Sequence, residues 1–202
     1  MLSELMDQLM LSSFWELGAL LLALAYLVLA AHQRQGCWLA AAVSCCVYAS
    51  IFWGAKLYME SLLQVIYVIM AGYGWWQWRQ QGTAIEENQR GHHYSFKWHF
   101  KQWVWVSVVA VVTALLLQNY TDADAVWLDT FTTAFSLLAT YLVTKKAMET
   151  WWYWLVIDSV YVYLYLSKGF VATAMLFVLY LVLVVYAMYR WRVDDGPAVQ
   201  TT

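Results

Sequence analysis

The feature that most constrains this chain is a series of seven apolar segments, each roughly 20 residues long, separated by short polar breaks. An α-helix rises ~1.5 Å per residue, so a segment of this length crosses the ~30 Å hydrocarbon layer of a membrane. Only 12% of the residues are charged, against about 25% in soluble domains. We therefore predict an all-α integral membrane protein with seven transmembrane helices. The predicted spans are 14–31, 37–54, 60–78, 102–118, 125–143, 150–166 and 170–190.

The breaks between these spans leave little room for a folded domain outside the membrane. Only residues 79–101 are long enough to form a linker. The first ten residues contain Glu4 and Asp7 but no Lys or Arg, unlike the basic start of a secretory signal peptide. We therefore expect the first span to remain in the mature protein.

The basic residues are distributed unevenly between the two sides of the predicted helices. Lys56 and Lys168 lie on one side, and nine of the eleven lie on the other. These nine are Arg34, Arg79, Arg90, Lys97, Lys101, Lys145, Lys146, Arg190 and Arg192. Because basic residues favour the cytoplasmic side, we predict an outside N-terminus and a cytoplasmic C-terminus.

The cysteines and histidines do not form a recognisable metal site. Cys37, Cys45 and Cys46 lie in or beside the second span, where small thiols pack well, so we expect no disulfide. His92, His93 and His99 lack a second ligand pair at zinc-site spacing, and we interpret them as solvated loop residues. We expect no cofactor and no nucleic-acid partner.

The sequence contains an internal repeat at an offset of 113 residues. The segment "YGWWQWR" that ends the third span is echoed by "YAMYRWR" at the end of the seventh. The matched pairs are Trp38 and Trp151, Tyr48 and Tyr161, Tyr67 and Tyr180, Tyr73 and Tyr186, Trp78 and Trp191, and Arg79 and Arg192. This offset pairs spans one to three with spans five to seven.

A repeat of three helices would insert upside down unless an extra helix restored its orientation. The fourth span provides that helix, so the two repeats are predicted to be parallel, in a 3+1+3 arrangement like that of SWEET-type facilitators. The predicted organisation is a first repeat at 1–78, a cytoplasmic loop and linker helix at 79–118, a second repeat at 119–192 and a cytoplasmic tail at 193–202.

One carboxylate, Asp158, lies in the middle of the aromatic sixth span. At 100° per residue it shares a stripe about 80° wide with Trp151, Trp154, Tyr161 and Tyr165. It lies nine residues after Glu149, or ~13 Å into the membrane. Such a carboxylate costs at least ~2.5 kcal/mol and normally faces a bundle interior or a wet cavity. A structural hydrogen bond to a neighbouring side chain is the alternative interpretation.

The third span has a comparable face made of Gln64, Tyr67, Ala71, Gly74 and Trp75. Its small residues allow a ligand or another helix to approach the backbone closely. Indole rings with an acid and an amide suit a flat, positively charged ring, because aromatic faces attract cations and a carboxylate adds charge pairing. Trp78 and Trp191, beside Arg79 and Arg192, are more typical of a membrane-interface belt or the bundle core.

Several motifs together resemble the PnuC family of bacterial vitamin transporters. They are Gln64, the "YGWW" element, Asp129, the Lys-x-x-x-Glu lead-in at 145–149 and the Trp-x-x-Trp pair at 151–154. The resemblance covers all seven spans. It implies a SWEET-like homotrimer that works by facilitated diffusion, after which a cytoplasmic kinase phosphorylates and traps the vitamin. The predicted substrate-binding residues are Gln64, Tyr67, Trp75, Asp129, Trp151, Trp154, Asp158 and Tyr161.

The substrate is predicted from departures from the family pattern. Members that carry nicotinamide riboside have asparagine at the positions of Ala71, Asp158 and Tyr186, and an acid at 158 suits the cationic rings of thiamine. Thiamine is therefore the leading prediction and nicotinamide riboside the alternative.

Functions of other classes are less well supported. A retinal protein would need a lysine within the seventh span, and an intramembrane enzyme would need a nucleophile and base or a metal pair, whereas no histidine lies in any predicted span. We therefore do not expect an enzyme. A membrane scaffold that transports nothing remains possible, and a vitamin-binding screen distinguishes it from a transporter.

Overall fold

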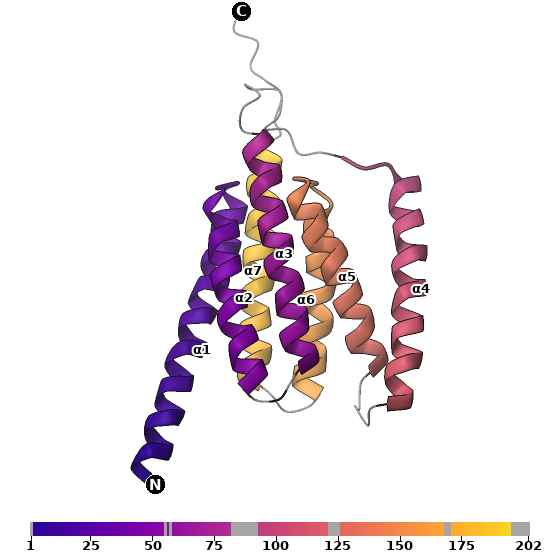
Figure 1. The fold of residues 1–202 in the computed structure, drawn as a ribbon. Helices are drawn as coiled ribbons and strands as arrows, with labels where there is room; N and C mark the ends of the chain where they lie inside the picture. The colour runs from indigo at the N-terminus through magenta and orange to yellow at the C-terminus, as the bar shows by residue number, and fades with distance from the viewer. Residues whose placement is uncertain are drawn as a thin grey trace, which may run out of the picture. The chain divides into compact units, whose positions relative to one another are not determined.

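The computed structural model describes residues 2–54, 56, 58–81, 93–120, 126–167 and 171–194 (Figure 1). These residues form seven α-helices and no strand. The helices are α1 (Leu2–Ala31), α2 (Gly36–Gly54), α3 (Tyr58–Gln81), α4 (Phe96–Tyr120), α5 (Val126–Thr144), α6 (Thr150–Ser167) and α7 (Val171–Asp194). The predicted seven-helix, all-α fold is confirmed.

Within the described residues, five helices are long and apolar enough to cross a membrane by length and composition alone. Helices α3 and α6 fall outside this group. Both are rich in tyrosine and tryptophan, whose rings carry a polar O–H or N–H group and therefore lower the hydropathy of a segment. The same polar aromatic groups make these two helices the candidates for binding a ligand.

The chain divides into two compact units, residues 1–86 and 87–202. In the first unit, α2 packs against both α1 and α3. In the second, α4 packs on α5, α5 on α6 and α6 on α7 (Figure 1). The predicted boundaries at 78/79 and 118/119 separate the two repeats from the loop and linker helix between them, and they stay a prediction. Residues 82–92 of the predicted loop and 195–202 of the predicted tail lie outside the described residues.

Helix α1 ends in a Schellman motif. The N–H of Arg34 donates to the carbonyl of Leu29 at 2.9 Å, and the N–H of Gln33 donates to Ala30 at 2.9 Å. Gln33 takes a φ of 51°, the left-handed conformation that closes such a cap. The last carbonyls of α1 are therefore satisfied without a glycine.

The end of α5 repeats this motif at the predicted offset. The N–H of Ala147 donates to Leu142 at 3.0 Å, the N–H of Lys146 donates to Val143 at 3.0 Å, and Lys146 has a φ of 52°. Each of these residues stands 113 positions after its counterpart in the first turn. The internal repeat is thus visible in backbone hydrogen bonds as well as in residue types.

A pair of perpendicular tryptophan rings forms the core of each repeat. Trp38 and Trp78 lie 5.3 Å apart at 84°, and Trp151 and Trp191 lie 5.1 Å apart at 89°. All four side chains are buried. An edge-to-face arrangement places the positive edge of one ring on the negative face of the other. Trp78 and Trp191 are therefore core residues, which was one of the two interpretations predicted for them.

Gly74 allows the first of these pairs to form. A Cβ atom at this position would lie 2.5 Å from the Trp38 ring, closer than atoms of real side chains approach each other. The small residues on this face were predicted to let a ligand or another helix approach. In this structure it is α2 that approaches them, through Trp38. Trp38 occupies the space that a side chain at position 74 would take.

Two predictions about the fourth helix are wrong. The predicted span begins at residue 102, whereas α4 begins at Phe96, where Ser95 caps the helix by accepting the Trp98 N–H at 3.4 Å. His99 was predicted to be solvated and outside every span, but it lies within α4 and is only 7% exposed. The alternation of charged and aromatic residues at 96–101 resembles a loop in sequence, but the segment is helical, packs on α5 and is hydrogen-bonded to Tyr153 of α6.

Two residues of α6 and its preceding turn hold the start of α4, and we call them the α4 clasp. The Glu149 carboxylate accepts the Tyr94 N–H at 3.1 Å and lies 3.2 Å from the His93 ring. One helical turn later, the Tyr153 hydroxyl accepts the Trp103 N–H at 2.7 Å and lies 2.9 Å from His99 Nδ1. The clasp fixes α4 to the second repeat. His92 lies outside the described residues.

Candidate functional site

The predicted stripe of α6 faces inward. Trp151 and Asp158 are buried and Trp154 and Tyr161 are half-buried. On the opposite side of the helix, large side chains are exposed, as a lipid-facing surface requires. They include Trp152, Val156 and Tyr163. The sequence therefore identified the inner face of this helix.

Asp158 is the unusual member of this face. Its side chain is 3% exposed, and among the described residues it forms no hydrogen bond or ion pair. Burying an unpaired carboxylate inside a membrane protein costs free energy. A carboxylate in such a place is therefore normally paired, or it contacts a ligand or water. The alternative prediction, a structural hydrogen bond to a neighbouring side chain, has no support in the described residues. That Asp158 contacts a ligand stays a prediction.

Tyr161, one turn further along α6, connects this face to α5. Its hydroxyl lies near the hydroxyls of Thr132 and Thr133 and near the Asp129 carboxylate. The predicted residues Asp129 and Tyr161 are thus brought together. Thr132 was not predicted, although it follows Asp129 by three residues and therefore shares a face of α5 with it.

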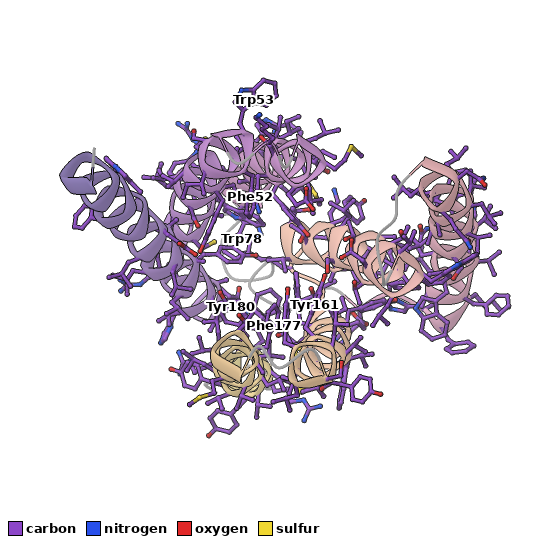
Figure 2. All side chains as sticks on the ribbon, turned by 90° about the horizontal axis from the view of Figure 1, so that it is seen from below. Phe52, Trp53, Trp78, Tyr161, Phe177 and Tyr180 are labelled. Atoms are coloured by element: carbon purple, nitrogen blue, oxygen red, sulfur yellow. The ribbon has the colours of Figure 1, made fainter. Side chains whose placement is uncertain are left out.

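Aromatic rings from α6 and α7 surround Tyr161. Phe177 lies 4.8 Å from the Tyr161 ring and 5.3 Å from the Tyr165 ring, and Tyr180 meets Phe177 edge-on at 5.5 Å. Figure 2 shows Tyr161, Phe177 and Tyr180 close together on the inner side of these helices. Sequence reasoning missed Phe177. Its signal is its three-residue spacing before Tyr180, which is paired with Tyr67 in the repeat.

The predicted residues of α3 belong to the other unit. Gln64 and Tyr67 are half-buried on the face that also carries Ala71 and Gly74, both buried. Trp75 is 38% exposed, and its backbone carbonyl accepts a hydrogen bond from the Gln35 side chain at 3.3 Å. That the faces of α3 and α6 together bind one ligand stays a prediction.

Trp151 differs from the other predicted residues in its surroundings. Its ring is fully buried against Trp191, and its indole N–H has no partner in the described residues. Trp38, its counterpart in the first repeat, has a buried and unpartnered N–H as well. The ring of Trp151 has a packing role here, and its role in binding stays a prediction.

Clusters of side chains that could hold a metal ion are absent from the described part of the chain. No cluster of three or more His, Cys, Asp or Glu side chains is found there. The three cysteines are free thiols. In the second unit, the candidate side chains therefore offer the carboxylates of Asp129 and Asp158, hydroxyl groups and aromatic rings.

These features accompany a match to a known family. Residues 13–193 match the family described as nicotinamide mononucleotide transporter. The chain belongs to this family. The predicted resemblance to PnuC proteins is confirmed, and the chain is a multi-pass membrane protein of that family.

Two relatives are similar in sequence. The riboflavin/roseoflavin transporter RibM of Streptomyces davaonensis is 26% identical, over 68% of this chain and 67% of its own. The nicotinamide riboside transporter PnuC of Escherichia coli is 23% identical, over 66% of each chain. The chain thus spans about two thirds of the length of these relatives. Both relatives are transporters and neither is an enzyme, in agreement with the sequence prediction.

A solved structure supports the fold. A crystal structure of the vitamin B3 transporter PnuC superposes with a TM-score of 0.67 at 21% identity, covering 91% of this chain and 82% of that one. The similarity confirms the predicted seven-helix, all-α fold.

Proposed function

We propose that this chain is a vitamin transporter whose substrate is a flat cationic nucleoside of the nicotinamide riboside type. The observation that carries the proposal is the buried, unpaired carboxylate of Asp158 beside the aromatic rings of α6 and α7. A pyridinium ring supplies the positive charge that this carboxylate lacks, and aromatic rings attract such a cation by ~0.5–2 kcal/mol each.

The leading sequence prediction, thiamine, is not supported by the relatives, which are named for riboflavin and nicotinamide riboside. The argument from Asp158 to thiamine also loses force on chemical grounds. The nicotinamide ring of the riboside carries a positive charge too, so an acid at position 158 does not distinguish the two vitamins. The alternative substrate of the sequence analysis is therefore our proposal.

Riboflavin is the second candidate, because RibM is one of the relatives. Its ring system is flat and aromatic but neutral, so it would make stacking contacts without pairing with Asp158. Charge thus separates the candidates. Removal of the Asp158 charge should weaken a cationic substrate and leave a neutral one nearly unchanged.

The deciding experiment is calorimetric titration of the purified protein with nicotinamide riboside, thiamine and riboflavin. We expect saturable heat with nicotinamide riboside and at least tenfold weaker binding of the other two. Tighter binding of either competitor would replace the proposed substrate. Absence of heat with all three would support a scaffold instead.

We further propose that the chain acts in a bacterial inner membrane by facilitated diffusion, as a homotrimer, with a cytoplasmic kinase trapping the vitamin. Liposomes containing the protein should equilibrate labelled nicotinamide riboside without accumulating it, with or without a proton gradient. Uphill accumulation driven by a gradient would contradict this mechanism.

The proposed orientation places the N-terminus outside and the C-terminus in the cytoplasm, since nine of the eleven basic residues lie on one predicted side. In intact cells, an impermeant thiol reagent should label a cysteine introduced at Asp122 and spare one introduced at Gln89. The reverse pattern would invert the orientation.

A further inference from the structure

An apolar groove lies on the second unit, on the side of α6 opposite to Asp158. It has a volume of about 300 Å³. Its lining residues are Trp103 of α4, Phe135 of α5, and Trp152, Tyr153, Val156 and Ile157 of α6. Val156 is 64% exposed. The groove therefore faces away from the candidate vitamin site and opens to the surroundings of the helices.

The polar groups of two lining residues, Trp103 and Tyr153, are bonded to each other. The Trp103 N–H donates to the Tyr153 hydroxyl at 2.7 Å, and His99 approaches the same oxygen at 2.9 Å. A polar solute would find these groups already engaged. The groove thus offers mainly hydrocarbon and aromatic surface, which suits an acyl chain.

The depth of the groove also suits a lipid. Trp103 lies seven residues after the start of α4, and Val156 lies six residues after the start of α6, so both are about 10 Å from the helix ends. Half of a ~30 Å hydrocarbon core is ~15 Å. The groove therefore lies within one leaflet, at the level of acyl chains.

A positive charge stands next to this groove. The Arg192 guanidinium lies 5.8 Å from the ring centroid of Trp152, one of the lining residues. Arg192 is exposed near the end of α7, where headgroups are found. One oxygen of the Glu149 carboxylate, three residues before Trp152, accepts the Tyr94 N–H and lies beside His93, and its other oxygen has no partner among the described residues. The exposed Arg192 guanidinium is the charge that complements an anionic headgroup.

We propose that this groove binds an anionic phospholipid, with an acyl chain against Trp103, Phe135 and Val156 and the headgroup phosphate at Arg192. Arg192 supplies selectivity for anionic over zwitterionic lipids, and the aromatic walls supply the chain-binding surface. A lipid bound here would brace α4 against α6, because the groove is lined by both helices.

The internal repeat provides matched controls for the test. Val43 and Arg79 stand 113 positions before Val156 and Arg192, and both are exposed. Val156→Trp should fill the groove and Arg192→Gln should remove its charge. Val43→Trp and Arg79→Gln make the same chemical changes in the first unit. All four positions are exposed, so the variants should fold.

The experiment measures retained lipid by native mass spectrometry after the full-length protein is extracted from mixed phosphatidylglycerol and phosphatidylcholine vesicles. We expect preferential retention of phosphatidylglycerol, lost in Val156→Trp and kept in Val43→Trp. Arg192→Gln should reduce the preference about fivefold, which corresponds to the ~1 kcal/mol that one basic residue contributes near an anionic surface. Arg79→Gln should leave it unchanged.

Three results would overturn the proposal. Equal retention of the two lipids would remove the selectivity. Unchanged retention in Val156→Trp would place the lipid elsewhere. A change of oligomeric state in Val156→Trp, without loss of lipid, would make the groove an interface between copies of this chain.

Discussion

The two repeats are nearly identical where they are packed and different where they carry polar groups. Both have the same Schellman turn and the same perpendicular tryptophan pair. Both also stack two rings along the middle helix: Tyr48 on Phe52 at 5.8 Å, and Tyr161 on Tyr165 at 6.0 Å. These shared features constitute the scaffold of a three-helix unit.

The differences lie on the middle helix of each repeat and on the first helix, which packs against it. Asp158 and Trp154 of α6 correspond to Cys45 and Ala41 of α2. Thr132 of α5, which interacts with Tyr161, corresponds to Ala19 of α1. At these positions the second repeat thus carries a carboxylate, an indole and a hydroxyl, which the first repeat lacks. The comparison separates residues that hold the fold from those that recognise a ligand.

The largest expected effect concerns the shared scaffold. Trp78→Ala and Trp191→Ala each remove half of a buried ring pair, and truncation of a buried tryptophan typically costs about 3–5 kcal/mol. Thermal unfolding in detergent should show a similar loss for both variants. A large loss for only one of them would show that the two pairs are not equivalent.

The second prediction concerns the clearest difference between the repeats. Asp158→Asn should weaken a cationic substrate tenfold to hundredfold, since a charge-assisted contact contributes about 1.5–3 kcal/mol. Cys45→Ser, at the corresponding position, should change affinity less than twofold. Calorimetric titration measures both variants, and equal effects would contradict the assignment of recognition to the second repeat.

The third prediction concerns the close approach of Trp38 to α3. Gly74→Ala introduces a methyl group where the Trp38 ring lies, and such overpacking typically costs about 1–3 kcal/mol. Gly72, in the same helix, has nothing within 4 Å of an added Cβ. Gly72→Ala should therefore be neutral or stabilising by up to ~1 kcal/mol. Equal melting temperatures for the two variants would contradict the tight contact.

The smallest expected effect concerns a hydroxyl group. Tyr161→Phe removes the interaction with Thr132 and should cost about 0.5–1.5 kcal/mol of stability. Tyr48→Phe should cost less, because the residues corresponding to Thr132 and Thr133 in the first repeat are Ala19 and Leu20. Melting curves of the two variants test the difference, and a larger loss in Tyr48→Phe would reverse it.

Sequence reasoning succeeded where one periodicity or one offset determines the structure. The 113-residue offset identified Trp38 and Trp151 as equivalent residues of the two repeats. The 100° periodicity placed Asp158 on the inner face of α6. Both signals come from regular helices, whose side-chain directions follow from residue number alone.

The start of α4 could not be predicted because tertiary contacts determine it. The segment around His99 alternates charged and aromatic residues and reads as a polar loop in the sequence. In the structure, Tyr153 and Glu149, some 50 residues later, hold this segment by hydrogen bonds. The contact of Thr132 with Tyr161 depends likewise on how α5 packs against α6. The substrate could not be deduced because thiamine and nicotinamide riboside offer the same charge to Asp158.

The α4 clasp bears on the origin of the gene. If an ancestral three-helix unit was duplicated and fused, the linker helix had to arise on one side of the junction. Glu149 and Tyr153, which hold α4, belong to the second copy, and the corresponding positions in the first copy are Gly36 and Ala40. Neither a glycine nor an alanine has a polar side chain that could form a hydrogen bond with such a helix. In this chain the linker helix is therefore held by an acid and a phenol that only the second copy carries at these positions.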